Sequence, residues 1–159
     1  MFNIQIPHDF YYIAFALGMV VFMVIFIPRS DIKELFPLSF VWGYLGSFLF
    51  VITFSGLLSY FRWQATPFTF ISSPLILNLS WIPALMIYLY FLPKEKHLFW
   101  LYLLTFSLVS AGIDSVFHQL GTLRYIFWGP MGRFIVAVLW FLGVTVHFNY
   151  LTKKKLKLV

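Results

Sequence analysis

The chain has 159 residues, of which 62% are hydrophobic, 23% are aromatic and only 10% are charged. A soluble domain is about a quarter charged, so this composition excludes an ordinary soluble protein and predicts a protein solvated by lipid. The sequence contains no cysteine, which excludes disulfides, thiol catalysis and thiolate metal ligands. Its net charge of +6 comes from basic residues that lie between apolar segments. Membrane lipids rather than nucleic acid are therefore the expected partner.

Five apolar segments follow one another, each close to the roughly 20 residues with which a helix crosses a bilayer. We predict an all-α fold, a polytopic transmembrane helix bundle that forms one domain over residues 1–159. Its spans are expected at about residues 9–28, 36–60, 73–92, 98–120 and 131–151. The first segment has no basic residue before it and Arg29 after it, the reverse of a signal peptide, so we interpret it as a retained helix.

Capping residues and prolines predict where individual helices begin and bend. Asp9 is a suitable N-cap for the first helix. Asp31 and Glu34 have the spacing of a capping box and are expected to begin the second. Pro37 lies just inside that start and Pro83 lies inside the third span, and each removes a backbone hydrogen bond. Both prolines therefore predict a bend.

The basic residues are divided unevenly between alternate loops, with eight in one set and three in the other. The first set contains Arg29, Lys33, Lys94, Lys96, Lys153, Lys154, Lys155 and Lys157. The second set contains Arg62, Arg124 and Arg133. The positive-inside rule then predicts that the N-terminus lies outside and the lysine-rich C-terminus in the cytoplasm.

The fourth span has one face of small and polar residues, which recur at spacings of three and four: Ser107, Ser110, Ala111, Asp114 and His118. Such a face favours close helix packing, and we expect Asp114 and His118 to point into the bundle. In the second span, Gly43 and Ser47 are expected to be packing contacts. Asn78 in the third span is expected to form a hydrogen bond between helices.

Asp114 follows the cytoplasmic start of the fourth span by about 16 residues, or roughly 24 Å along a helix. This depth places it in the outer half of the membrane, where the three arginines of the second loop set also fall. A buried carboxylate needs a basic partner. Arg133, early in the fifth span, is the first candidate, and Arg124 is the second.

Four interpretations of this polar cluster are open. Asp114, His118 and an arginine could form a buried group that fixes helix register. The cluster could instead be an outward-open site for a lipid headgroup or small anion, since Arg62, Arg124 and Arg133 suit phosphate or carboxylate. His118 beside Asp114 could relay protons. Finally, Asp114 and His118 could ligate a catalytic metal, as in ceramidase-like membrane enzymes.

The metal interpretation is the weakest of the four. The remaining histidines are poorly placed, because His97 and His147 fall at the cytoplasmic side and only His8 could join His118. Three-histidine coordination on one side is therefore excluded, and no histidine pair has matched depth for haem. We expect neither a metal site nor a cofactor.

Several short motifs resemble a known family when they are taken in order: "IPRSDIKE" after the first span, "TPFTFISSP" before the third, the late acidic residue of the fourth, and "RYIFW" before the fifth. The chain resembles small, uncharacterised integral membrane proteins of spore-forming Gram-positive bacteria (Firmicutes). The resemblance implies five spans and a location in the bacterial inner (cytoplasmic) membrane. It implies that Asp114 replaces a glutamate, and it assigns no role to His118.

The favoured functional hypothesis is a small non-enzymatic membrane protein, alone or as a subunit of a membrane assembly, with an outward-facing site built from Asp114, His118, Arg133, Arg124, Arg62 and Ser110. Its expected partners are membrane lipids and either another protein or a second copy of the chain. The first alternative is a transport or channel component for a small ligand or protons. The second is a membrane-embedded lipid-modifying enzyme.

Overall fold

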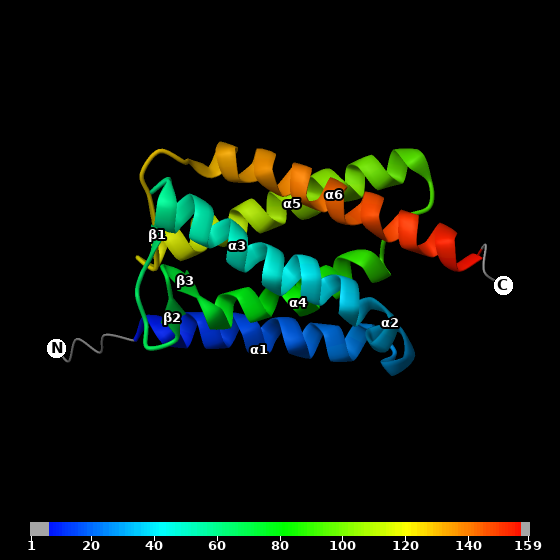
Figure 1. Ribbon diagram of the computed structural model, residues 1–159, viewed down its shortest axis with the longest axis horizontal. Helices are drawn as coiled ribbons and strands as arrows, with labels where there is room; N and C mark the ends of the chain where they lie inside the picture. Colours follow the sequence, from blue (N-terminus) through cyan, green and yellow to red (C-terminus); the bar gives the residue numbers. More distant parts are fainter. Residues whose placement is uncertain (1–6, 157–159) are drawn as a thin grey trace.

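The computed structural model describes residues 7–156, which form a bundle of helices with a few very short strands (Figure 1). The helical elements are α1 (His8–Phe26), α2 (Arg29–Ser39), η1 (Phe40–Gly46), α3 (Ser47–Val51), η2 (Ile52–Leu57), α4 (Leu75–Tyr90), α5 (Lys96–Gln119) and α6 (Pro130–Leu156). The strands are β1 (Phe61–Trp63), β2 (Thr69–Phe70), β3 (Ser73–Pro74) and β4 (Leu123–Tyr125). The predicted all-α class is confirmed at this level.

The chain runs back and forth between two ends of the bundle (Figure 1). All four strands lie at the end where α1 begins, and we call this the ribbon end, formed by residues 58–74 and 120–129. Residues 27–28, residues 91–95 and the end of α6 lie at the opposite end, which we call the lysine end. The two loop sets that the sequence distinguishes by charge therefore lie toward opposite ends of the bundle, apart from Lys157, which is outside the described residues.

Within the described residues, four helices are long and apolar enough to cross a membrane: His8–Phe26, Arg29–Leu57, Lys96–Gln119 and Pro130–Lys153. The fifth apolar helix, α4, has 16 residues, or about 24 Å of length, against a hydrocarbon core of about 30 Å. Most of its residues are buried, since α1, α2 and η1 all pack on it. These helices support a helical membrane protein in which α4 is covered by its neighbours.

The second membrane-length helix is continuous from Arg29 to Leu57, but two of its stretches, η1 and η2, are π-helical. It begins earlier than the sequence predicts, after Pro28, and no side chain caps it. The predicted capping box is therefore wrong, because Asp31 already lies in the first turn. The same correction applies to Asp9, since α1 begins at His8 after Pro7. Pro7 and Pro28 each supply the extended backbone that precedes a helix.

The helices form two groups, and aromatic side chains form the contacts between one group and the other. α5 packs on α6, while α1, α4 and the α2–η1 segment pack on one another. Between the groups, the ring of Trp42 meets Trp140 edge-on at 5.3 Å between centroids, and the ring of Tyr88 lies 4.7 Å from that of Phe141. These large rings join the two groups and also separate their backbones. A cavity can form in the space between the two groups.

Two antiparallel pairs of strands close the ribbon end. β1 pairs with β4 over a long sequence separation, and β2 pairs with β3 in a two-residue hairpin. The hairpin turn places Ile71 and Ser72 at φ values of 44° and 63°. A type I′ turn needs positive φ at both positions and is usually made by Asn-Gly, so the β-branched Ile71 is strained there.

Gly43 permits the closest approach between the long helix and α4. A Cβ atom added there would lie 2.7 Å from the backbone oxygen of Trp81, whereas one added at Gly112 would meet nothing within 4 Å. We expect Gly43→Ala to destabilise the protein by about 1–3 kcal/mol, because the two backbones must separate. Gly112→Ala, also in a helix, is expected to be neutral or slightly stabilising. Thermal unfolding of both variants in the same detergent measures the difference, and equal stability would contradict this packing.

Candidate functional site

An ion pair between α5 and α6 lies at the centre of the site. The Nε–H group of Arg133 donates to the Oδ2 atom of Asp114. The Asp114 side chain is 4% exposed and that of Arg133 is 14% exposed. The guanidinium of Arg133 also lies over the ring of Phe50, at 5.6 Å from its centroid. The structure thus pairs Asp114 with the arginine that depth in the membrane favours, and the charges neutralise each other inside the bundle.

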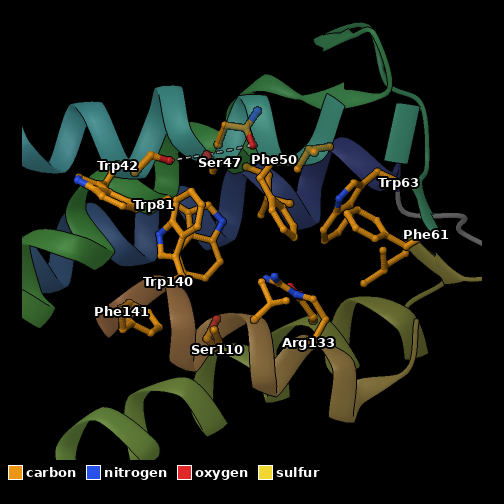
Figure 2. Close-up of a pocket in the computed structure, with 18 of the residues that line it drawn as sticks. Trp42, Ser47, Phe50, Phe61, Trp63, Trp81, Ser110, Arg133, Trp140 and Phe141 are labelled. Carbon is orange, nitrogen blue, oxygen red and sulfur yellow. Dashed lines mark hydrogen bonds and ion pairs between the residues drawn. The ribbon is translucent and has the colours of Figure 1, made fainter. Parts of the chain in front are cut away.

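This pair lines a cavity of about 60 Å³ between the two groups of helices. Figure 2 shows Arg133 pointing from α6 into this space, with Phe50 across from it. A single water needs roughly 10–15 Å³ by the same measure, so the cavity has room for a few waters or for a molecule of only a few heavy atoms. Free space inside the bundle therefore adjoins the ion pair.

Neutral polar groups from three segments complete the lining. Ser110 lies on α5, one turn before Asp114, and it is buried at the cavity wall. Asn78 of α4 donates through Nδ2 to the Ser73 hydroxyl at 2.6 Å, and its Oδ1 lies 3.4 Å from the Ser47 hydroxyl. Asn78 thus connects α4 to the long helix and to β3, as expected for an amide that bonds between helices.

Aromatic side chains form most of the remaining wall. Figure 2 shows Trp42, Trp81 and Trp140 gathered at one side of the cavity and Phe61 and Trp63 at the other. Sequence reasoning did not identify these residues as part of the site. A signal was present, because the first three lie within apolar segments, whereas membrane tryptophans are enriched at the two interfaces. Tryptophans at such depth indicate an interior wall.

The β1–β4 ribbon covers the cavity with one face. Phe61 and Trp63 from β1, with Leu123 and Tyr125 from β4, line the cavity. Because side chains alternate along a strand, the residues between them project from the opposite face. These are the two arginines of the ribbon, Arg62 and Arg124, which are directly opposite each other and exposed.

This arrangement corrects the prediction of a single cluster. Arg62 and Arg124 do not line the cavity, because the ribbon lies between them and the buried pair. His118 does not line it either. It is exposed in the last turn of α5, its Nδ1 atom lies 2.8 Å from the Leu123 carbonyl oxygen, and its ring packs on Tyr125. Of the six predicted residues, the cavity brings together Asp114, Arg133 and Ser110.

In the described part of the chain, a buried hydrogen-bond donor without an acceptor lies where the cavity meets the ribbon. The buried indole Nε1–H of Trp63 has no acceptor in the described part of the chain. Burial raises the pKa of the Tyr125 hydroxyl and the Asp114 carboxylate raises it further, whereas a hydrogen bond with Ser115 and the charge of Arg133 lower it. Only Nε of the Arg133 guanidinium bonds to Asp114 among residues 7–156. The remaining donors suit a ligand that carries an acceptor oxygen.

Histidine and carboxylate side chains do not gather elsewhere in the described residues. Within residues 7–156, no three of them lie close enough together to hold a metal ion. The Asp114 and His118 side chains that a metal site would need are directed to different surroundings, the first to Arg133 and the second to the Leu123 carbonyl group.

Comparison with known proteins adds no relative: no family model, no curated protein and no solved structure matches the chain. The resemblance to the Firmicutes membrane proteins therefore rests on the short motifs of the sequence.

Removing one member of the buried pair should be far more costly than removing both. Arg133→Met leaves the Asp114 carboxylate without a partner in an apolar setting, and we expect a loss of about 3–5 kcal/mol of unfolding free energy. The double variant Asp114→Leu with Arg133→Met should recover most of that loss, because no unpaired charge remains. Arg124→Gln, which removes an exposed arginine, is the control. Unfolding in mild detergent measures all three, and additive losses in the double variant would contradict a coupled pair.

Proposed function

We propose that the chain is a small, non-enzymatic integral membrane protein that binds a small ligand in the cavity beside Asp114 and Arg133. In this proposal five spans cross the membrane of a bacterial cell, with the N-terminus and the ribbon end at the outer surface and the lysine end in the cytoplasm. The ligand is largely apolar and carries one oxygen acceptor. The protein acts alone or as a subunit of a membrane assembly, with membrane lipids around it.

The observation that carries this proposal is the cavity that adjoins the buried pair. A pair that served only to fix helix register would be expected to have its surroundings filled by packing. Here aromatic rings provide apolar walls, and Arg133 and Trp63 provide donors at one side. Pockets for small molecules commonly combine apolar walls with a few polar groups that orient the ligand.

The distribution of charge supports the proposed orientation. Arg29, Lys33, Lys94 and Lys96 lie at the lysine end, as does the last part of α6, which contains Lys153. The ribbon end has fewer basic residues, and one of the three in its loop set, Arg133, is neutralised by Asp114. The positive-inside rule counts Lys and Arg near the membrane and assigns the richer side to the cytoplasm.

Transport of a small ligand or of protons is the second candidate, because polar groups continue beyond the cavity. Trp42 lines the cavity, and its Nε1–H donates to Nδ1 of His147 at 3.0 Å in α6. That contact extends the polar lining toward the lysine end. The enzyme alternative lacks such support, since it needs Asp114 and His118 to line one cavity and only Asp114 does so.

Single-cysteine labelling tests the orientation cleanly, because the natural chain has no cysteine. Ala65 and Glu95 are exposed in loops at the two ends. In intact cells, a membrane-impermeant maleimide should label Ala65→Cys, while Glu95→Cys should react only after the cells are permeabilised. The reverse pattern would contradict the proposed orientation, and labelling of both residues in intact cells would contradict an odd number of spans.

Filling the cavity tests the binding proposal. Ala137 lines the cavity, whereas Leu139, two residues later on α6, is 63% exposed on the outer face of the bundle. Wild-type protein purified natively in mild detergent should carry a small molecule that mass spectrometry detects after extraction. Ala137→Leu should lose most of it because the added atoms occupy the space, and Leu139→Phe should keep it. Wild-type protein that carries no small molecule would contradict the proposal.

A further inference from the structure

The outer face of the β1–β4 ribbon presents a second feature that the cavity does not explain. Arg62 and Arg124 are cross-strand partners, so their Cα atoms are roughly 4.5–5.5 Å apart and their side chains leave the same face of the ribbon. Like charges directly opposite each other destabilise a strand pair. A ribbon that carries two facing arginines therefore gains from an anion between them.

Residues 7–156 supply no such anion. Neither arginine side chain forms an ion pair or hydrogen bond within residues 7–156. Of the five acidic residues, three lie at the lysine end, and Asp114 is bonded to Arg133. Asp9 is the remaining carboxylate, and it makes no ion pair in the described part of the chain. The two positive charges on the ribbon are thus left for an external partner.

The two arginines are also held in place. The other face of the ribbon packs into the bundle, with Phe61 and Leu123 each 3% exposed. The Tyr12 hydroxyl donates to the Thr122 carbonyl oxygen at 3.2 Å, which ties α1 to the start of β4. A fixed backbone spacing lets two guanidinium groups bind one ligand with little loss of conformational freedom.

We propose that Arg62 and Arg124 together bind one phosphate group at the ribbon end. Each planar guanidinium can donate two parallel hydrogen bonds to phosphate oxygens, so two opposed guanidiniums offer more donors to one phosphate group than one does. The source is either the phosphate of a lipid headgroup or free inorganic phosphate. Phe127, three residues beyond Arg124, is 79% exposed, which suits contact with the membrane interface next to the headgroups.

The test uses the full chain in a phosphate-free non-ionic detergent, with binding followed by phosphorus NMR. Short-chain phosphatidylglycerol is the probe, and inorganic phosphate is the competitor. We expect the Arg62→Gln, Arg124→Gln double variant to bind the lipid about tenfold or more weakly than wild type. Arg29→Gln with Lys33→Gln removes the same charge at the lysine end and should bind as wild type does.

The two sources separate in this experiment. Displacement of the lipid by inorganic phosphate would identify free phosphate as the ligand, whereas lipid binding that inorganic phosphate does not displace would identify the headgroup. Wild-type affinity in the Arg62→Gln, Arg124→Gln variant would overturn the proposal. An equal loss of affinity in the lysine-end control would overturn it too. Either result would mean that the lipid is attracted by the overall positive charge and not bound by these two arginines.

A stability measurement guards against a folding artefact. Without ligand, the Arg62→Gln, Arg124→Gln variant should unfold at the same temperature as wild type or slightly higher, since it loses only repulsion between exposed side chains. A lower unfolding temperature in the absence of phosphate would mean that the arginines stabilise the ribbon by themselves, and this result would also overturn the proposal. Neither site requires the other to be occupied, so either proposal can fail while the other stands.

Discussion

The pair between Asp114 and Arg133 is the constraint on which the arrangement of the bundle depends. A carboxylate or a guanidinium alone inside a membrane span costs about 2.5–3.5 kcal/mol even on the mildest scale. Each therefore has to face the other, which fixes the rotation of α5 and α6 about their axes and the offset between them. The same rotation turns the Ser107 and Ser110 face of α5 inward, where both serines are buried. One electrostatic requirement thus orients two of the five apolar helices.

The cavity follows from how the other three helices meet this pair of helices. Small residues bring α4 and the long helix together at Gly43, whereas large rings lie between these helices and α6. Small residues allow backbones to approach and rings keep them apart, so the two contacts differ in kind. Protein interiors usually contain few voids larger than a water molecule, so the cavity among these rings is an unusual feature of the bundle. The ion pair of Asp114 and Arg133 borders the cavity and supplies charged groups to a wall that is otherwise largely aromatic.

Sequence alone predicted the helical class, the approximate apolar segments and the pairing of Asp114 with Arg133. The hydropathy of each segment depends on its local composition, and the depth of a residue in the membrane follows from its position along the segment. It missed the β1–β4 ribbon, since two three-residue strands separated by about 60 positions leave no periodic signal. That omission also explains the misplaced arginines: alternation along β1 and β4 turns Arg62 and Arg124 away from the cavity. His118 was misjudged because α5 ends one residue later, at Gln119, and the chain folds back so that the His118 ring contacts the Leu123 carbonyl group and Tyr125.

The β1–β4 ribbon links the two proposed sites physically. One of its faces lines the cavity, and the other carries the two exposed arginines. Two-stranded pairs are marginal by themselves, so this one depends on the inward packing of Phe61 and Leu123 and on its connections to α1. Repulsion between the two arginines acts against that packing, and a phosphate between them would remove the repulsion. Phosphate would therefore tighten the ribbon over the cavity. The coupling has a definite sign: an anion on the outer face should slow exchange of a ligand from the cavity beneath it.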